Sequence, residues 1–530
     1  MAAPPANAPA LGARLLSSLR APGSSTQTLL DSVGRGIEKE SLRVTSGDGT
    51  LSHQAHPPEL GSALTHPNIT TDFSEAQLEL ITDVHRSPEA VIAQLRDVHR
   101  FVYQNLADEI LWTASMPCML GNDEDIPVGQ YGSSNIATAK TVYRLGLGNR
   151  YGRLMQTISG IHYNFSLPDE FWGAYAQHLE RPNDQALRNE AYFGLIRNFQ
   201  RYSWLLIYLF GASPAVCKSF AKHQAHNLEP FDEGSLYLPY STSLRMGRLG
   251  YQSDAQSRLH ISYNSIDEYD ASIRPALSEP FPAYERVGVK VGGEYRQLNA
   301  ALLQIENEFY GTIRPKRRIQ SGERPLNALR ARGVEYVEVR CIDLNPFLPL
   351  GIDEAQIRFL DLFLLYCLLT DSPPDNEAES ARLAGNQLTT VERGRQPGVL
   401  LDAPEGAVQL SSWGQAIISA CEPLIALLDG ENGTRYAQAW RTQQAKLGDS
   451  EQTPSARVLK AMSDDQIAFF RFAMNQSVAH AEYFAQHRLS AQELAQEQAV
   501  AAESLERQAR IEAEDEAPFD EFLESYLALP

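Results

Sequence analysis

Two charged side chains stand out in residues 333–340, GVEYVEVR, a stretch that otherwise has the alternating pattern of a strand. Because side chains alternate along a strand, Glu338 and Arg340 share one face and lie about 7 Å apart. A carboxylate beside a guanidinium suits a site that holds a metal ion and a phosphate group together. On this strand alone, the simpler explanation is an ion pair on a solvated sheet face. A site becomes the better explanation because other strands repeat the pattern.

Further strand-like stretches carry carboxylates or histidine in the same alternating way. These residues are Glu38 and Glu40 in residues 35–45, Asp72 and Glu79 in residues 69–82, and His162 in residues 160–168. Carboxylates brought close together repel one another and take up protons unless cations neutralise them. Oxygen-rich sites with one histidine suit Mg²⁺ or Mn²⁺ rather than structural zinc. Taken singly, Glu38 and Glu40 also fit a solvated face, and His162 fits a hydrogen-bonded core histidine.

The segments between these strands predict helices. Residues 87–109 have helical spacing behind a Ser-Pro start that is typical of a helix N-terminus. Helical patterns also cover residues 137–159, where glycines break the helix, and residues 184–211 and 351–371. Asp353 is the expected N-cap of the last of these helices. Residues 297–318 combine an acidic-aromatic strand with a basic segment, and residues 372–410 indicate a surface crossing.

Long segments without a regular βαβ rhythm join the strand candidates. We therefore predict an α+β fold, with a mostly antiparallel sheet surrounded by helices. Residues from about 405 to 530 form the expected helical C-terminal region, and its polar helix at residues 485–515 is more typical of a solvated surface than of a contact surface. We expect one large catalytic unit over residues 1–530, with its core sheet and helices at about residues 30–370.

Composition excludes several classes of partner. The chain has 530 residues, a formal net charge of −20 and a pI of about 5.1, so it repels nucleic acid and anionic membranes. Its most apolar run, residues 362–369, is too short to span a bilayer, and the N-terminus lacks the pattern of a secretory signal. We expect a soluble cytoplasmic protein.

The cysteines point to the same compartment. The chain has five of them, an odd number, widely spaced and without a CxxC motif. This pattern fits a reducing compartment with mostly buried thiols, and it argues against a disulfide scaffold or a zinc site. Cys341 follows Arg340 but faces away from it by alternation, so we expect a core residue rather than a nucleophile.

Several motifs together resemble one known family. They are GIEKESLRV, ITTDFSEAQLELIT, LMQTISGIHYNFSLP, FGASPAVC, LPYSTSLR, QIENEFYGTIRPKR and GVEYVEVRCIDLNPF. In this order, from about residue 35 to 370, they resemble the motifs of bacterial glutamate–cysteine ligases of the proteobacterial type. That family is related in fold to glutamine synthetase. The resemblance thus implies a funnel-like active site, formed by antiparallel strands, that holds two or three divalent metals between ATP and glutamate.

The resemblance also implies residue roles. Glu38, His162 and Glu338 would hold the metal that bridges the ATP phosphates, and Arg340 would stabilise the transferring phosphoryl group. Glu40, Asp72 and Glu79 would hold a metal nearer the glutamate γ-carboxylate. The implied cofactor is Mg²⁺ or Mn²⁺, and ATP is a substrate.

For the cysteine substrate, the resemblance implies an aromatic pocket with an arginine for the carboxylate. The residues concerned are Phe73, Tyr143, Arg144, Arg245, Tyr251 and Tyr310. The residues alone support this only in part, because Tyr143, Tyr251 and Tyr310 also fit ordinary aromatics at the edge of a core. The arginine roles stay open as well, since Arg314, Lys316, Arg317 and Arg318 could also reach phosphates.

The implied reaction is ATP-dependent ligation of the γ-carboxylate of glutamate to the amine of cysteine through γ-glutamyl phosphate. Glutathione is the implied feedback inhibitor, and a monomer is the working expectation. Three alternatives remain: a related glutamate–amine ligase with another acceptor, a non-catalytic metal or nucleotide sensor, and an interaction protein that uses the C-terminal helices. The complete set of seven polar positions argues against a decayed site.

Overall fold

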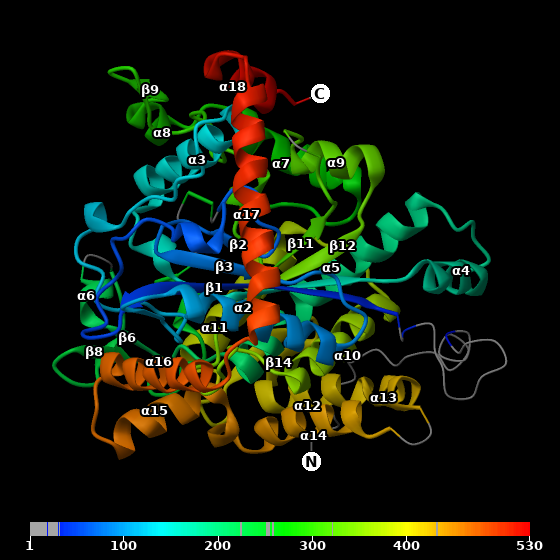
Figure 1. Cartoon of the computed structure of the whole chain (residues 1–530). Coiled ribbons are helices and arrows are strands. Elements are labelled where there is room, and N and C mark those ends of the chain that lie inside the picture. The colour runs from blue at the N-terminus through cyan, green and yellow to red at the C-terminus, as the bar shows by residue number, and fades with distance from the viewer. Residues whose placement is uncertain are drawn as a thin grey trace.

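The computed structural model describes residues 19, 30, 32–222, 225–250, 255–256, 259–320, 322–430 and 433–529 (Figure 1). A seven-stranded sheet lies at its centre, in the order β11-β12-β5-β1-β3-β2 with β4 paired to β1. The strands are β1 Gly34–Thr45, β2 Ile69–Thr71, β3 Gln77–Ile81, β4 Glu109–Leu111, β5 Ile161–Ser166, β11 Ile313–Lys316 and β12 Tyr336–Ile342. Every paired strand is antiparallel, which confirms the predicted sheet.

Three helices pack against one face of this sheet: α2 Pro88–Asn105, α5 Gln185–Phe210 and α10 Glu354–Leu369. All three lie where the sequence predicts helices. The predicted cap at Asp353 is confirmed, because its side chain accepts a hydrogen bond from the backbone N–H of Gln356 at 2.8 Å. On β5 the apolar residues Ile161, Tyr163 and Phe165 alternate toward these helices and are fully buried. The opposite face therefore receives the polar residues of the same strands.

The remaining elements surround the sheet (Figure 1). The helices are α3 Asn135–Tyr151, α4 Asp169–His178, α6 Lys218–Ala221, α7 Ile266–Ser278, α8 Pro282–Val287, α9 Pro325–Arg332, α11 Glu377–Arg393, α12 Leu410–Ala420, α13 Glu422–Asp429, α14 Arg435–Gly448, α15 Pro454–Asp464, α16 Phe469–Gln486, α17 Ala491–Glu514 and α18 Phe519–Leu527. Short strands are β6 Ala215–Cys217, β7 Glu229–Pro230, β8 Ser235–Tyr237, β9 Lys290–Val291, β10 Glu294–Tyr295, β13 Leu400–Ala403 and β14 Gly406–Gln409. The C-terminal region is helical, as predicted, and none of the described helices has the length and apolar character that a membrane span needs.

Two segment predictions are wrong. Residues 372–410 contain helix α11 and the β13–β14 hairpin rather than a plain crossing; Asn376 caps α11 by accepting from the N–H of Glu379. Residues 297–318 hold a 3₁₀ turn, Glu306–Glu308, and the short strand β11 instead of a strand in their acidic half. The predicted glycine break within residues 137–159 is confirmed: the helix ends at Tyr151, and Gly152 adopts φ +82°, which only glycine reaches at little cost.

Candidate active site

Strand β1 brings the predicted residues together through its two neighbours. Glu38 lies directly opposite His162 on β5, and Glu40 lies directly opposite Glu79 on β3. On the far side of β5, Glu338 of β12 pairs in register with Asn164, two residues beyond His162. Side chains two residues apart on a strand share a face, so all of these polar groups emerge from the same side of the sheet.

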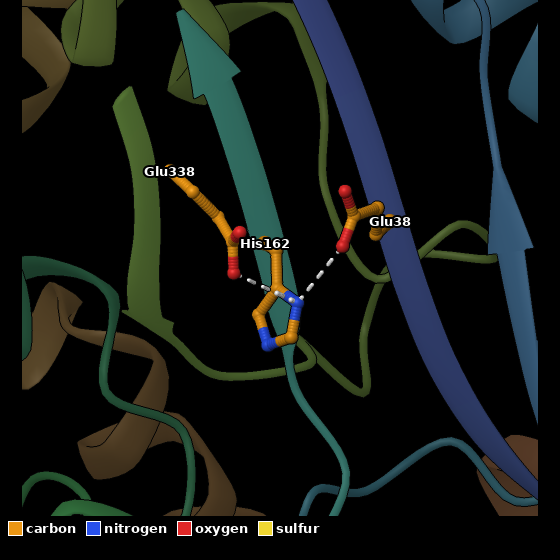
Figure 2. Close-up of side chains that lie close together, drawn as sticks. All are labelled: Glu38, His162 and Glu338. Carbon is orange, nitrogen blue, oxygen red and sulfur yellow. Dashed lines mark hydrogen bonds and ion pairs between the residues drawn. The ribbon is translucent and has the colours of Figure 1, made fainter. Parts of the chain in front are cut away.

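Glu38, His162 and Glu338 converge from three adjacent strands (Figure 2). Each offers one potential ligand atom, and these atoms all lie within 4.8 Å of one another. The Nδ1 atom of His162 is 3.2 Å from Glu38 Oε2 and 3.8 Å from Glu338 Oε1, and its Nε2 atom is 3.4 Å from Glu40 Oε1. Asn164 donates to the other oxygen of Glu38 at 2.8 Å.

The protonation state of His162 shows that this trio fits a cation. Burial, followed by the positive charge of Arg340, lowers the pKa of His162 to about 3, so the ring is neutral at physiological pH. A neutral imidazole carries one N–H, yet carboxylate oxygens face both of its nitrogens. One lone pair therefore points at negative charge, which a divalent cation between the groups would reverse. Two carboxylates and one imidazole suit Mg²⁺ or Mn²⁺.

Three more carboxyls, Glu40, Asp72 and Glu79, extend the cluster. Burial, then repulsion from Asp72, raises the pKa of Glu40 to about 8. Burial, then repulsion from Glu38, raises the pKa of Glu79 well above its usual value, and burial raises that of Asp72. Within the described residues these three do not form a group as tight as the first. Bound cations would favour the ionised form of all three.

Two basic side chains reach the cluster beside Glu338. Arg340 donates from Nη1 to Glu338 Oε1 and lies 3.5 Å from His162 Nδ1. Lys316 Nζ is 2.5 Å from the other oxygen of Glu338, and burial lowers the pKa of this lysine to about 8. Of the basic residues that the sequence left open, Arg314 and Arg317 donate instead to backbone carbonyls. Lys316 lies on β11, the strand that pairs with β12, and this position could have distinguished it from the other basic residues as the one that contacts Glu338.

The predicted cysteine-binding residues are divided between several places. Arg245, Tyr310 and Arg340 line one cavity of about 240 Å³. Arg245 is buried, donates to the carbonyl of Arg340 at 2.9 Å and lies 3.6 Å from Asp343. The floor and walls of this cavity also include Met246, Tyr263 and Thr312.

Three of the other predicted residues lie elsewhere. Phe73 is buried in an apolar cluster, and Tyr143 and Arg144 line a different cavity, of about 400 Å³, beside α3. Arg144 donates from Nε to the backbone carbonyl of Asp72. Tyr251 lies outside the described residues. The structure thus brings together the two arginines Arg245 and Arg340 with Tyr310, and not the full aromatic set.

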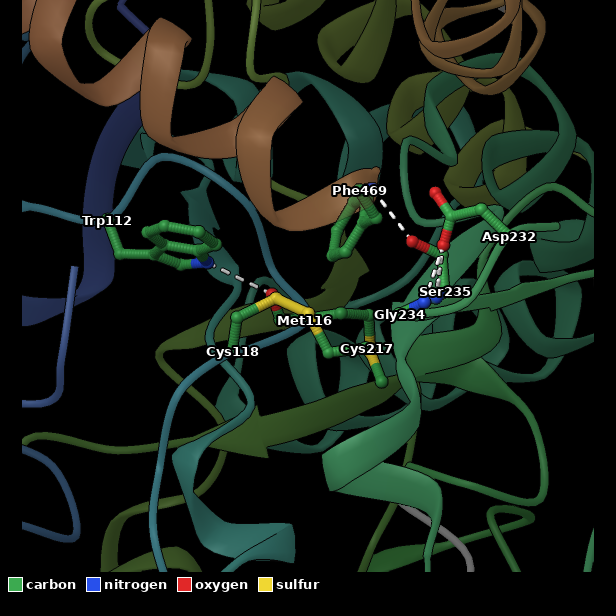
Figure 3. The surroundings of a disulfide bond; sticks show 8 residues. All are labelled: Trp112, Met116, Cys118, Cys217, Asp232, Gly234, Ser235 and Phe469. Carbon is green, nitrogen blue, oxygen red and sulfur yellow. Dashed lines mark hydrogen bonds between the residues drawn. A yellow bond between two sulfur atoms is a disulfide. The ribbon is translucent and has the colours of Figure 1, made fainter. Parts of the chain in front are cut away.

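The cysteines lie apart from this cluster, and the prediction of free thiols is wrong for two of them. Cys118 and Cys217 form a disulfide although 99 residues separate them in the sequence (Figure 3). Sequence spacing cannot reveal such a pair, because the fold alone decides that their Cα atoms lie 5.7 Å apart. Cys341, Cys367 and Cys421 are free and buried, which confirms Cys341 as a core residue.

Comparisons with known proteins identify relatives of this chain. Residues 19–390 match the family model described as Glutamate-cysteine ligase. Glutamate–cysteine ligases of Saccharophagus degradans and Alcanivorax borkumensis are 49% and 51% identical to the chain; the alignments cover 95% and 94% of it and 96% of each relative.

Solved structures extend the likeness to three dimensions. The crystal structure of glutamate–cysteine ligase from Francisella tularensis in complex with AMP superposes with a TM-score of 0.88 at 36% identity, over 94% of this chain and 97% of that one. A bifunctional glutathione synthetase from Pasteurella multocida, 24% identical over 86% of this chain and 52% of that one, shares the fold with a TM-score of 0.66. The chain belongs to the glutamate–cysteine ligase family.

Proposed function

We propose that the protein joins the γ-carboxylate of L-glutamate to the amine of L-cysteine at the expense of ATP. The γ-phosphoryl group of ATP passes to the γ-carboxylate, and the cysteine nitrogen then displaces phosphate from the acyl carbon of γ-glutamyl phosphate. The products are γ-glutamylcysteine, ADP and phosphate, in the first step of glutathione biosynthesis. The convergence of Glu38, His162 and Glu338, with Arg340 beside them, is the observation that carries this proposal.

Two groups of residues would hold divalent cations. Glu38, His162 and Glu338 fit an ion near the ATP phosphates, and Glu40, Asp72 and Glu79 fit a second ion nearer the glutamate carboxylate. Bound Mg²⁺ or Mn²⁺ supplies charge neutralisation where two anions must meet. The raised pKa values of Glu40 and Glu79 support this assignment, because these carboxyls are costly to ionise without cations.

The chain's own cations act on the transferring group. Arg340 and Lys316 both contact Glu338, so each is held at the cluster before substrate arrives. The planar guanidinium of Arg340 can donate two hydrogen bonds to phosphoryl oxygens. Preorganised donors of this kind stabilise charge that develops in the transition state without reorganising at that moment.

The cavity that Arg340 shares with Arg245 and Tyr310 fits an amino acid substrate. Its volume of about 240 Å³ accommodates a small molecule, and Arg245 and Arg340 provide positive charge for a carboxylate. Met246 and Tyr263 add apolar surface to a lining that also contains polar side chains, so the cavity can hold both the apolar and the polar parts of an amino acid.

Further parts of the proposal follow from the substrates. Glutathione contains the γ-glutamylcysteine unit, so we expect it to compete with glutamate. We also propose a monomer in the cytoplasm as the working form.

The test is phosphate release from Mg-ATP with glutamate and cysteine present, and with each omitted in turn. The proposal expects release that requires both amino acids, and γ-glutamylcysteine in the product by mass spectrometry. Release with glutamate and a different amine, but not with cysteine, would keep the ligase chemistry and overturn the acceptor. Absence of release under all conditions with folded protein would overturn the proposal.

A further inference from the structure

Helix α17 is mostly exposed, as expected, but Ala501 and Ser504 are buried, and several of its side chains contact the loops that precede β2 and α3. In Figure 1 it crosses the front of the molecule from α16 to α18, which packs beside α3. Its polar side chains make specific contacts: Ser504 Oγ accepts from the N–H of Ser62 at 2.9 Å, Gln508 Oε1 accepts from Ser62 Oγ at 2.6 Å, and Glu512 Oε1 accepts from the N–H of Ser133 at 2.8 Å. The polar helix therefore has partners far away in the sequence.

The contact with Ser133 belongs to a tight turn at residues 130–135. Gly132 in this turn has φ +109°, and a Cβ atom there would lie 2.2 Å from Glu512 Oε1 and 2.3 Å from Gln508 Nε2. The turn and the helix thus approach as closely as a glycine permits. Beyond the end of α17, Asp515 accepts from the side-chain amide of Asn135 at 2.6 Å, so both ends of the turn are held.

Tyr131 connects this turn to the metal cluster. Its side chain is 2% exposed, and its hydroxyl lies 2.9 Å from the carbonyl of Thr71 and 3.1 Å from the carbonyl of Asp72, to both of which it can donate. The hydroxyl also accepts from Thr71 Oγ1 at 2.9 Å. The guanidinium of Arg144 stacks on the Tyr131 ring at 4.5 Å and donates to the same Asp72 carbonyl.

These contacts fix the backbone at the end of β2, where Asp72 follows Thr71. The Asp72 carboxyl is buried at the cluster, close to Glu38 and to the guanidinium groups of Arg144 and Arg340. The side chains of Tyr131 and Arg144 donate to the backbone carbonyl of Asp72 and so hold the residue that carries this carboxyl. Metal ligands must be held within about 0.5 Å of their working positions by such supporting contacts.

We propose that Tyr131 is a positioning residue for the metal ligand Asp72, and that α17 holds Tyr131 in place through Glu512. This inference rests on the metal role of Asp72 in the proposed function. It assigns the C-terminal helix to the metal site, through a chain of contacts from Glu512 to Ser133, Tyr131 and the Asp72 carbonyl.

The first experiment measures Mn²⁺ binding to the substrate-free protein by electron paramagnetic resonance. Tyr131→Phe keeps the stacked ring and removes only the hydroxyl, and we expect its Mn²⁺ dissociation constant to rise about tenfold. Tyr208→Phe is the matched control: Tyr208 is 3% exposed and donates to the carbonyl of Lys446 at 2.8 Å, far from the cluster. Both variants remove a buried hydroxyl that donates to a backbone carbonyl, and Tyr131→Phe also removes the acceptor for Thr71 Oγ1; a loss of Mn²⁺ affinity in Tyr131→Phe and not in Tyr208→Phe therefore marks the positioning role.

A second pair of variants tests the helix without disturbing the core. Glu512→Ala removes the acceptor for Ser133 and should weaken Mn²⁺ binding about threefold, whereas Glu512→Gln keeps a carbonyl acceptor and should restore it. Glu503→Ala, which breaks an exposed contact with Arg507 on the same helix, should leave Mn²⁺ binding unchanged.

Asp72→Asn separates this inference from the proposed function. Weak Mn²⁺ binding in Asp72→Asn, with wild-type binding in both Tyr131→Phe and Glu512→Ala, would overturn the positioning role and leave the proposed function intact. Wild-type binding in Asp72→Asn would overturn both the metal role of Asp72 and the inference built on it.

Discussion

Both faces of the central sheet bury charged side chains, but these charges are partnered differently on the two faces. On the face covered by helices, Arg35 of β1 pairs with Asp361 of α10 at 2.8 Å, and Tyr163 and Tyr436 donate to the two oxygens of the same carboxylate. One cation therefore meets one anion, and every oxygen of that anion has a partner. This charge cluster is complete within the protein itself.

On the open face, five carboxyls crowd one another; Arg340 and Lys316 contact Glu338 directly, and Arg144, Arg245 and Arg314 also lie close enough to lower the pKa values of Glu40, Asp72 or Glu79. The carboxyls are Glu38, Glu40, Asp72, Glu79 and Glu338. Some of the pKa shifts here record repulsion, whereas the Arg35–Asp361 pair is neutral in sum. The difference lies in how the carboxyls are partnered: on the open face they crowd one another and the pKa values of Glu40, Asp72 and Glu79 are raised, which is typical of functional sites, whereas both oxygens of Asp361 have partners.

The largest effect is expected from Glu338→Gln on the open face. It removes a carboxylate that belongs to the metal trio and contacts both Arg340 and Lys316. Losing a metal ligand should cost several kcal/mol of transition-state stabilisation, about 10³-fold in phosphate release. Full activity in a folded variant, checked by circular dichroism, would make the open face an ordinary set of ion pairs.

On the covered face the same chemical change should act on stability instead. Asp361→Asn leaves the buried Arg35 without its counter-charge, and the free energy of unfolding should fall by about 3–5 kcal/mol. Urea denaturation measures this loss, and Mn²⁺ binding by the remaining folded protein should not change. A loss below about 1 kcal/mol would mean that the pair is not the structural element described above.

Glu79→Gln sharpens the comparison because its effect on stability should have the opposite sign. Burial and repulsion from Glu38, Asp72 and Glu40 make the charged form of Glu79 unfavourable. At pH 8 and without metal, the amide should therefore raise the free energy of unfolding by about 1 kcal/mol while lowering activity. A destabilised variant under these conditions would show that repulsion does not dominate the open face.

A smaller effect concerns pH. The pKa of Glu40 rises from 4.5 to about 8 on folding, so between these values the folded state binds more protons than the unfolded state. The contribution of Glu40 to stability is thus greatest at low pH and is lost as pH rises toward 8. In metal-free protein, the free energy of unfolding of wild type minus that of Glu40→Gln should fall from pH 5 to pH 8. Saturating Mn²⁺ should abolish this slope, and a slope of the opposite sign would contradict the assignment.

The sequence predicted which side chains share a face, because alternation along a strand is local geometry. Alternation thus predicted that Glu38 shares a face with Glu40, and Glu338 with Arg340, before the order of the strands in the sheet was known. The register that sets Glu38 opposite His162 depends on contacts between segments more than 100 residues apart, and only the family resemblance grouped these ligands in advance.

Two kinds of feature could not be predicted from the sequence: those that depend on contacts between distant segments, and those whose local composition favours another structure. The Cys118–Cys217 bond and the link from Glu512 to Tyr131 leave no local pattern. Helix α11 did leave one, since Asn376 followed by Glu379 marks a helix start, but the surrounding prolines and glycines favoured a loop.

The most direct test of the account is calorimetric titration of the substrate-free protein with Mn²⁺ at pH 7, in two buffers of different ionisation enthalpy. Because burial and repulsion raise the pKa of Glu40 to about 8, Glu40 holds a proton at pH 7 that a cation displaces; binding should therefore release protons, and Glu338→Gln should bind Mn²⁺ much more weakly. Proton release would confirm that bound cations neutralise the carboxyls of the open face. Binding without proton release, and unchanged in Glu338→Gln, would contradict it.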